Sequence, residues 1–118
     1  MIFVTGATGF VGASLSARLA SGEAGPFRLA SRRPIDPRLC SDVFTIGDSL
    51  DSVDWRGALA GVDSIVHLAA RVHVMDERAA DPLAAFRAAN VTATLSLARA
   101  AIDAGVRRFV FASSLKVL

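Results

Sequence analysis

The sequence predicts an α/β protein built around a parallel β-sheet. Short runs of β-branched and aromatic residues alternate along the chain with alanine-rich stretches that have helical spacing. The first run, residues 2–5, is continuously apolar, as expected for a strand that is buried on both faces. The chain has 118 residues, of which 53% are hydrophobic, so it fits one domain with a substantial core and not a disordered segment.

A helix is expected after the first strand, from about Phe10 to Ser21. Gly22 and the pair Gly25-Pro26 follow it and favour a stop. One face of this helix carries apolar side chains at positions i, i+4 and i+8, namely Val11, Leu15 and Leu19. We expect that face to pack against the sheet.

The middle of the chain contains the next three expected strands, over residues 27–30, 43–46 and 64–68. The segment 31–42 contains Pro34 and Pro37, so the crossover between the first two of these strands cannot hold a long helix. A short helix is expected near residues 53–60, before the last of the three.

The longest helix is expected to begin at Asp81 and Pro82, because Asp is a favoured N-cap and Pro a favoured first residue. Gly105 should end this helix, and a fifth strand should follow over residues 108–112. One helix face, which we expect to be buried, carries Leu83, Phe86, Asn90, Ala93, Leu97 and Ala101. The sequence stops soon after the fifth strand, with no helix to cover that strand.

A glycine-rich loop, residues 5–12, connects the first strand to the first helix with the spacing G-x-x-G-x-x-G. Gly6 would permit a tight turn, and Gly9 would let backbone N–H groups approach a pyrophosphate. Gly12 would let the helix press against the sheet. Backbone amides at a helix N-terminus, together with the helix dipole, favour an anion. The strand–loop–helix context therefore predicts a dinucleotide site.

Five segments in order resemble motifs of the extended short-chain dehydrogenase/reductases, the nucleotide-sugar epimerase/dehydratase group. Residues 5–12, Thr-Gly-Ala-Thr-Gly-Phe-Val-Gly, resemble the N-terminal fingerprint of this family. Gly47-Asp48 resembles its adenine-contacting segment, and residues 67–70, His-Leu-Ala-Ala, resemble its fourth-strand signature. Asn90 lies in a segment similar to the Asn-Val-x-Gly-Thr helix motif, and Phe-Ala-Ser-Ser at residues 111–114 resembles the motif that ends in the catalytic serine.

The resemblance implies a Rossmann-type doubly wound parallel sheet with strand order 3-2-1-4-5, truncated after the fifth strand. It implies that Ser114 is the catalytic serine, whose hydroxyl would hydrogen-bond a sugar hydroxyl or keto oxygen. Asn90 would be a structural support near the site. The cofactor contacts are expected from Gly6, Thr8, Gly9, Phe10, Val11, Gly12, Ser31, Arg32, Asp48, Ser49, Leu68, Ala69, Ala70 and Asn90.

The choice between NAD and NADP depends on the end of the second strand. NAD-binding proteins of this type place a carboxylate there, but this sequence has Ser31-Arg32-Arg33 and no acid before Asp36. A guanidinium can bind a 2′-phosphate bidentately, so Arg32 and Arg33 slightly favour NADP. The alternative is that the two arginines form a solvated loop. Asp48 could likewise accept a hydrogen bond from the adenine amino group or serve only as a loop carboxylate.

The remaining reactive residues suggest structural roles. His67 lies within an apolar strand and fits a hydrogen-bonded core histidine better than a proton shuttle. His73 follows in a segment that resembles the variable loop that helps to frame the substrate in the family. Cys40 is the single cysteine, so no intrachain disulfide is possible and the thiol is expected to be inert. No His, Cys, Asp and Glu spacing indicates a metal site.

The composition limits the chemistry of the chain. All but one of the 13 basic residues are arginines, Lys116 is the exception, and tyrosine is absent. The family carries proton transfer on a Tyr-x-x-x-Lys pair beyond the fifth strand, where the lysine cation lowers the tyrosine pKa. We therefore expect that residues 1–118 are the dinucleotide-binding domain of a longer enzyme. This fragment would lack the substrate-binding part and would be inactive alone.

The function expected for the parent protein is NAD(P)-dependent hydride transfer at a carbon of a nucleotide sugar, by an epimerase or dehydratase that resembles UDP-hexose 4-epimerases. One alternative is an NADPH-dependent reductase of the same superfamily, similar to dihydroflavonol reductases; another is a non-catalytic dinucleotide-sensing regulator.

The long helix resembles the one that pairs in family homodimers. The net charge of +2 does not indicate a nucleic-acid surface, and no segment reads as a membrane span or signal peptide, so a cytoplasmic protein is expected.

Overall fold

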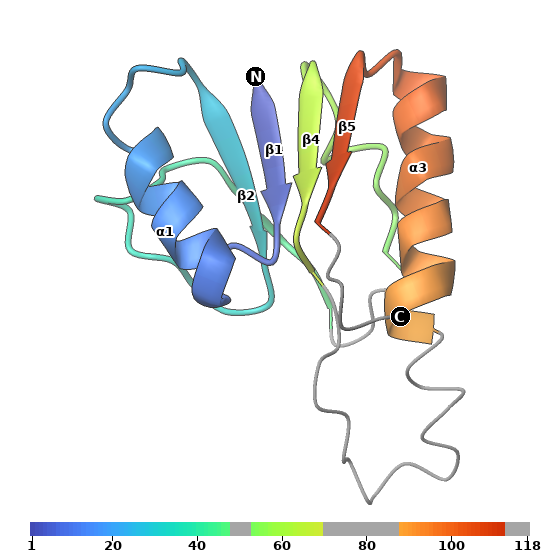
Figure 1. Ribbon diagram of the computed structural model, residues 1–118, viewed down its shortest axis with the longest axis horizontal. Helices are drawn as coiled ribbons and strands as arrows, with labels where there is room; N and C mark the ends of the chain where they lie inside the picture. The colour runs from blue at the N-terminus through green and yellow to red at the C-terminus, as the bar shows by residue number, and fades with distance from the viewer. Residues whose placement is uncertain (48–52, 70–87, 113–118) are drawn as a thin grey trace, which may run out of the picture.

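A computed structural model of the protein describes residues 1–47, 53–69 and 88–112. Five strands form one sheet in which every pairing is parallel, in the order β3-β2-β1-β4-β5 (Figure 1). The strands are β1 (Ile2–Thr5), β2 (Phe27–Ser31), β3 (Val43–Thr45), β4 (Ser64–His67) and β5 (Arg108–Phe111). The predicted Rossmann-type sheet and its strand order are confirmed, and each strand lies within one residue of its predicted bounds.

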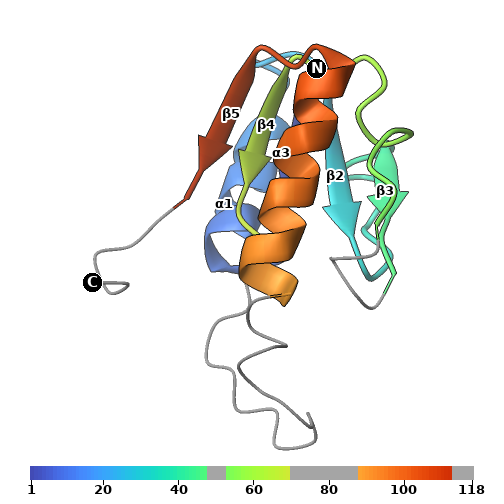
Figure 2. The same cartoon turned by 90° about the vertical axis from the view of Figure 1, so that its right-hand side faces the viewer.

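Two helices cover opposite faces of the sheet, α1 (Phe10–Leu19) and α3 (Ala93–Ala104). Figure 2 shows α3 in front of the sheet and α1 behind it. Successive residues of β1 point to the two faces, so Phe3 and Val4 belong to different core clusters. Phe3 packs with Leu97 and Ala101 of α3, whereas Val4 lies in the cluster that includes Leu19 of α1. The central strands are therefore covered on both sides, as the apolar run of β1 predicts, whereas most residues of the edge strand β5 are exposed.

The buried face of α1 differs from the prediction. Val11 is 59% exposed, Leu15 is half-buried and Leu19 is buried, while the other buried residues are Gly12 and Ser16. Gly12 faces the glycine loop at a distance so short that any side chain there would collide with the backbone of Gly6. That close approach rotates Val11 away from the sheet, which apolar spacing alone does not indicate. The helix also ends at Leu19, two residues before the expected Ser21.

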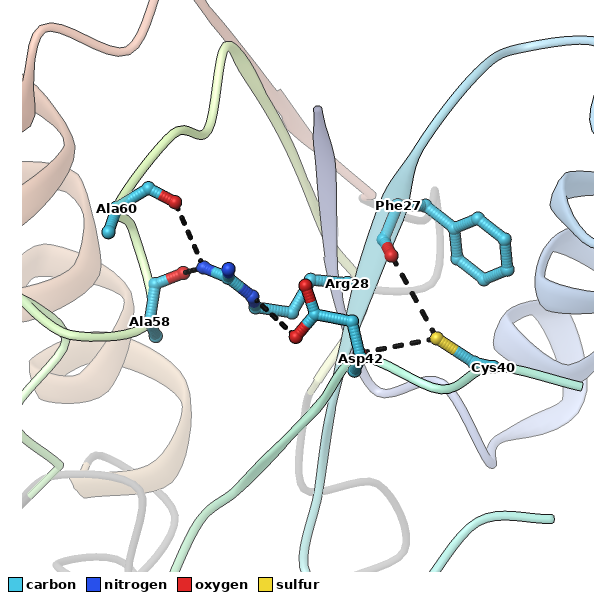
Figure 3. Close-up of polar contacts among 6 residues, drawn as sticks. All are labelled: Phe27, Arg28, Cys40, Asp42, Ala58 and Ala60. Atoms are coloured by element: carbon cyan, nitrogen blue, oxygen red, sulfur yellow. Dashed lines mark hydrogen bonds and ion pairs between the residues drawn. The ribbon is translucent and has the colours of Figure 1, made fainter. Parts of the chain in front are cut away.

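The helix expected near residues 53–60 is replaced by consecutive turns over residues 56–61. Gly61 has a φ of +75°, which lies outside the right-handed helical region. The Arg28 guanidinium also donates hydrogen bonds to the carbonyls of Ala58 and Ala60, at 2.5 and 3.1 Å (Figure 3). These carbonyls are thus satisfied by a side chain from β2. Trp55 lies at the start of this segment and its ring meets Phe3 edge to face at 6.1 Å.

The long helix is irregular where its described part begins. A π-helical turn, η2 (Ala88–Thr92), precedes α3. Three residues of the predicted inner face are buried, Ala93, Leu97 and Ala101, and Gly105 ends the helix with a φ of +76°. The predicted start and the first apolar positions of that face lie outside the described residues, at Asp81, Pro82, Leu83 and Phe86.

Candidate functional site

The glycine loop is folded tightly against the end of β4. Gly6 directly follows β1 and has a φ of +71°, a conformation that favours glycine. A Cβ atom at Gly6 would lie 2.6 Å from the backbone nitrogen of Ala69. Gly6 therefore meets two requirements at once, the left-handed turn and the close approach of two backbone segments.

The same loop is closed by the first turn of α1. A Cβ atom at Gly12 would overlap the carbonyl oxygen of Gly6, so only glycine allows this packing. The Gly9 amide donates to Gly6 O at 3.1 Å, and the Ala13 amide donates to Gly9 O at 2.8 Å. Gly9 is the N-cap of α1 and supplies no side-chain cap. The first amides of the helix thus point out of its N-terminus without a capping side chain, which suits an anion.

A row of hydrogen bonds connects β1, β4 and the irregular turn η2. Thr5 Oγ1 lies 2.6 Å from His67 Nδ1 and accepts hydrogen bonds from the amides of Leu68 and Ala69, both at 3.2 Å. His67 Nε2 lies 2.9 Å from Thr94 Oγ1. Thr94 Oγ1 in turn donates to the carbonyl of Asn90 at 2.8 Å, so the row runs from the glycine loop to the helix.

His67 is a core residue, as the sequence predicts. It is 1% exposed, with both ring nitrogens in hydrogen bonds and with Phe109 and Phe111 at ring-centroid distances of 6.1 and 5.9 Å. Burial lowers its pKa to about 4, because desolvation disfavours the charged imidazolium. His67 is therefore neutral near pH 7.

The end of β2 forms a compact turn that displays two arginines. Ser31 is buried, and its hydroxyl donates to Arg33 O at 2.6 Å and accepts from the Arg33 amide at 3.1 Å. Arg32 and Arg33 are exposed. The Ser31 hydroxyl is thus engaged within the chain, and it holds the backbone from which both arginines project.

The structure brings together many of the residues that the resemblance assigns to the cofactor. Parallel strands end at the same edge of a sheet, so the glycine loop, the Ser31-Arg32 turn and Leu68-Ala69 all lie at the carboxyl edge. Phe10 is 95% exposed at the N-terminus of α1, beside the exposed Thr8 and Val11. Four assigned residues lie outside the described part of the chain: Asp48, Ser49, Ala70 and the expected catalytic residue Ser114.

Two residues at this edge are absent from the expected set. Thr5 and Thr94 contact His67 from β1 and α3. Thr5 directly precedes Gly6, and Thr94 follows Asn90 by one helical turn, which is the signal that sequence reasoning could have used.

Residues 1–47, 53–69 and 88–112 contain no group of three His, Cys, Asp or Glu side chains that could hold a metal ion. None of the helices in these ranges has both the length and the hydropathy needed to cross a bilayer.

Comparison with known proteins places this fold and loop in one family. The model of the NAD dependent epimerase/dehydratase family matches residues 2–118, and the chain belongs to this family. It is 42% identical over 118 residues to a UDP-glucose 4-epimerase of Vibrio cholerae, covering 98% of this chain and 35% of that protein. It is 35% identical over 122 residues to a 3-beta-hydroxysteroid dehydrogenase of Mycolicibacterium neoaurum, covering 99% of this chain and 32% of that protein.

Solved structures show the same similarity. A short-chain dehydrogenase/reductase superfamily protein from Agrobacterium tumefaciens with bound NAD superimposes with a TM-score of 0.77 at 36% identity, over 97% of this chain and 32% of that chain. MoeE5 in complex with UDP-glucose and NAD superimposes with a TM-score of 0.75 at 30% identity, over 98% and 37% of the two chains. The chain thus spans about a third of the length of the relatives that it matches.

Proposed function

We propose that the chain is the dinucleotide-binding part of an NAD(P)-dependent epimerase or dehydratase that acts on a nucleotide sugar. The observation that carries this proposal is the interlocked loop, in which Gly6 and Gly12 are both required by backbone contact. This loop lies beside the point where the strand order reverses, between β1 and β4, which is where doubly wound sheets bind ligands. The family membership and the NAD-bound structural relatives support the same assignment.

The residues at the carboxyl edge of the sheet fit such a cofactor. Backbone amides at Phe10 and Val11, in the first turn of α1, would hold the pyrophosphate at the positive end of that helix. Leu68 and Ala69 would line the cofactor from the end of β4. The bound dinucleotide would supply the hydride acceptor for oxidation of a sugar carbon.

The chemical step needs residues that these 118 residues do not all provide. Ser114 is proposed to hydrogen-bond the reacting sugar oxygen. The sequence has no tyrosine that could act as the phenolate base of a Tyr-x-x-x-Lys pair. We therefore propose that this chain holds the cofactor and that the base and most of the sugar pocket lie in other parts of the enzyme, so the chain alone is inactive.

The Ser31-Arg33 turn supports a role for NADP. Its exposed arginines, Arg32 and Arg33, stand at the end of β2, where a guanidinium could bind the 2′-phosphate of the adenosine. We propose that NADPH binds at least as well as NADH. This turn also favours the second candidate function, an NADPH-dependent reductase of the same superfamily.

Isothermal titration calorimetry with NADH and NADPH tests the site. The Gly12→Ala variant should lose measurable binding of both, because the new methyl group overlaps the Gly6 carbonyl. Gly57→Ala is the matched control, since no atom lies within 4 Å of its added Cβ. Absence of binding by the unaltered chain would contradict the proposal. Clearly tighter NADH binding that Arg32→Ala leaves unchanged would contradict the NADP preference.

A further inference from the structure

One arrangement of protons satisfies every hydrogen bond of the row through His67. Thr5 Oγ1 accepts the amide hydrogen of Ala69 and shares that of Leu68 with the Thr5 carbonyl, and its own hydrogen then points to His67 Nδ1. Nδ1 is then the acceptor, and the neutral ring carries its hydrogen on Nε2. Nε2–H donates to Thr94 Oγ1. The Thr94 hydroxyl donates its hydrogen to the carbonyl of Asn90, which completes the row.

Each end of this row meets a wall of the candidate cofactor site. At one end, Thr5 holds the Leu68 and Ala69 amides where Gly6 packs against the Ala69 backbone. At the other end, the Thr94 hydroxyl bonds the Asn90 carbonyl within the wide turn η2. Wide π-helical turns are rare and are frequent at functional sites, and a threonine that bonds the carbonyl four residues earlier bends a helix.

The ring of His67 hydrogen-bonds both threonines of this row. It is 1% exposed and packed beside Phe109 and Phe111, so it cannot turn away from either partner without leaving a buried polar group unpaired. A fixed ring therefore sets the spacing between the end of β1 and the start of α3.

We propose that His67 is a positioning residue that couples the glycine loop to the helical turn at Asn90 through Thr5 and Thr94, so that both walls of the site are set before the dinucleotide binds. The proposal rests on the proposed cofactor function. When both walls are already ordered, none of the binding free energy is lost in ordering them. Loosening either end of the row should therefore weaken dinucleotide binding.

The Thr94→Val variant tests this coupling, because valine keeps the shape of threonine and removes both hydrogen bonds of its hydroxyl. We expect the affinity for NAD(H), measured by calorimetry at a temperature well below the melting transition of the variant, to fall about tenfold. Thr94→Ser should restore binding because it keeps the hydroxyl. Thr92→Val is the matched control, since Thr92 is exposed on the same helical segment and lies outside the row. Should Thr94→Val fail to fold, Thr94→Ala replaces it.

Amide hydrogen exchange gives a second measurement that does not depend on the cofactor. In Thr94→Val, exchange at Leu68 and Ala69 should become faster, although both amides bond Thr5 and not Thr94. A merely local role of Thr94 would leave these two amides unchanged, and that result would overturn the proposal. Unweakened NAD(H) binding by Thr94→Val would also overturn it. If the unaltered chain binds no dinucleotide, the proposed function fails and the exchange data alone decide the coupling.

Discussion

The guanidinium of Arg28 binds the carboxylate of Asp42, with 2.9 Å between Nε and Oδ1 (Figure 3). The Arg28 side chain is 16% exposed, and its Nη1 reaches the carbonyls of Ala58 and Ala60. One residue of β2 thus connects the segment that enters β3 with the turns over residues 56–61. Cys40 lies beside this cluster, with its thiol donating to the carbonyl of Asp42 at 3.2 Å.

Removing this connection should destabilise the fold. We expect Arg28→Ala to lower the free energy of unfolding by about 2 kcal/mol, because it leaves partly buried acceptors without their charged donor. Arg28→Lys should recover part of the loss, since an ammonium cannot reproduce the fork of the guanidinium. Urea denaturation measures both. Arg38→Ala is the control: its side chain is 92% exposed in a pair with Asp36, and a loss equal to that of Arg28→Ala would contradict the assignment.

The lowered pKa of His67 makes stability depend on pH. The folded pKa is about 4, below the usual value of 6.5, so between these values the unfolded chain binds more protons than the folded one. Stability should be complete above about pH 6.5 and should decline as the pH falls towards 4, by up to about 3 kcal/mol. Urea midpoints measured from pH 7 to pH 5 should show this slope. His67→Gln should flatten it, and an unchanged slope would exclude His67 as its source.

The core between α3 and the sheet depends on Leu97. This side chain is fully buried and shares a cluster with Phe3 and Ile65. Leu97→Ala should lower the free energy of unfolding by about 3 kcal/mol, because it removes apolar contacts and leaves a cavity. The same substitution at Leu95, which is 49% exposed on the same helix, should change stability by less than about 1 kcal/mol. Equal effects in thermal or urea unfolding would show that α3 does not pack as described.

The strands were predictable because each carries its own local signal. Ile2–Thr5 is an apolar run, and its burial on both faces follows from that pattern alone. The interrupted segment over residues 56–61 was not predictable, since its carbonyls are taken by Arg28, which lies far away in the sequence. Exposure of Val11 depends on the contact between Gly12 and Gly6, which outweighs apolar spacing.

The residues of the candidate site likewise differ in how far the sequence alone indicates them. Gly6 and Gly12 could be assigned from a short stretch of sequence, because the strand, the loop and the helix that they join are consecutive. The sequence places Thr5 and Thr94 next to Gly6 and Asn90, but no local pattern indicates that the fold brings both threonines from separate elements to His67. The π-helical turn at Asn90 also has no distinct sequence pattern, because its apolar spacing matches that of the α-helix that follows.

The central position of β1 has a consequence for synthesis of the chain. Ile2 pairs with Phe27 on one side and with Ser64 on the other, so β1 is translated well before either of its edges can be filled. Long-range parallel pairing of this kind forms slowly and leaves apolar segments exposed in the meantime. A nascent chain therefore carries an apolar Ile2–Thr5 segment with at least one unpaired edge until β4 has left the ribosome, and during that interval this edge is open to aggregation.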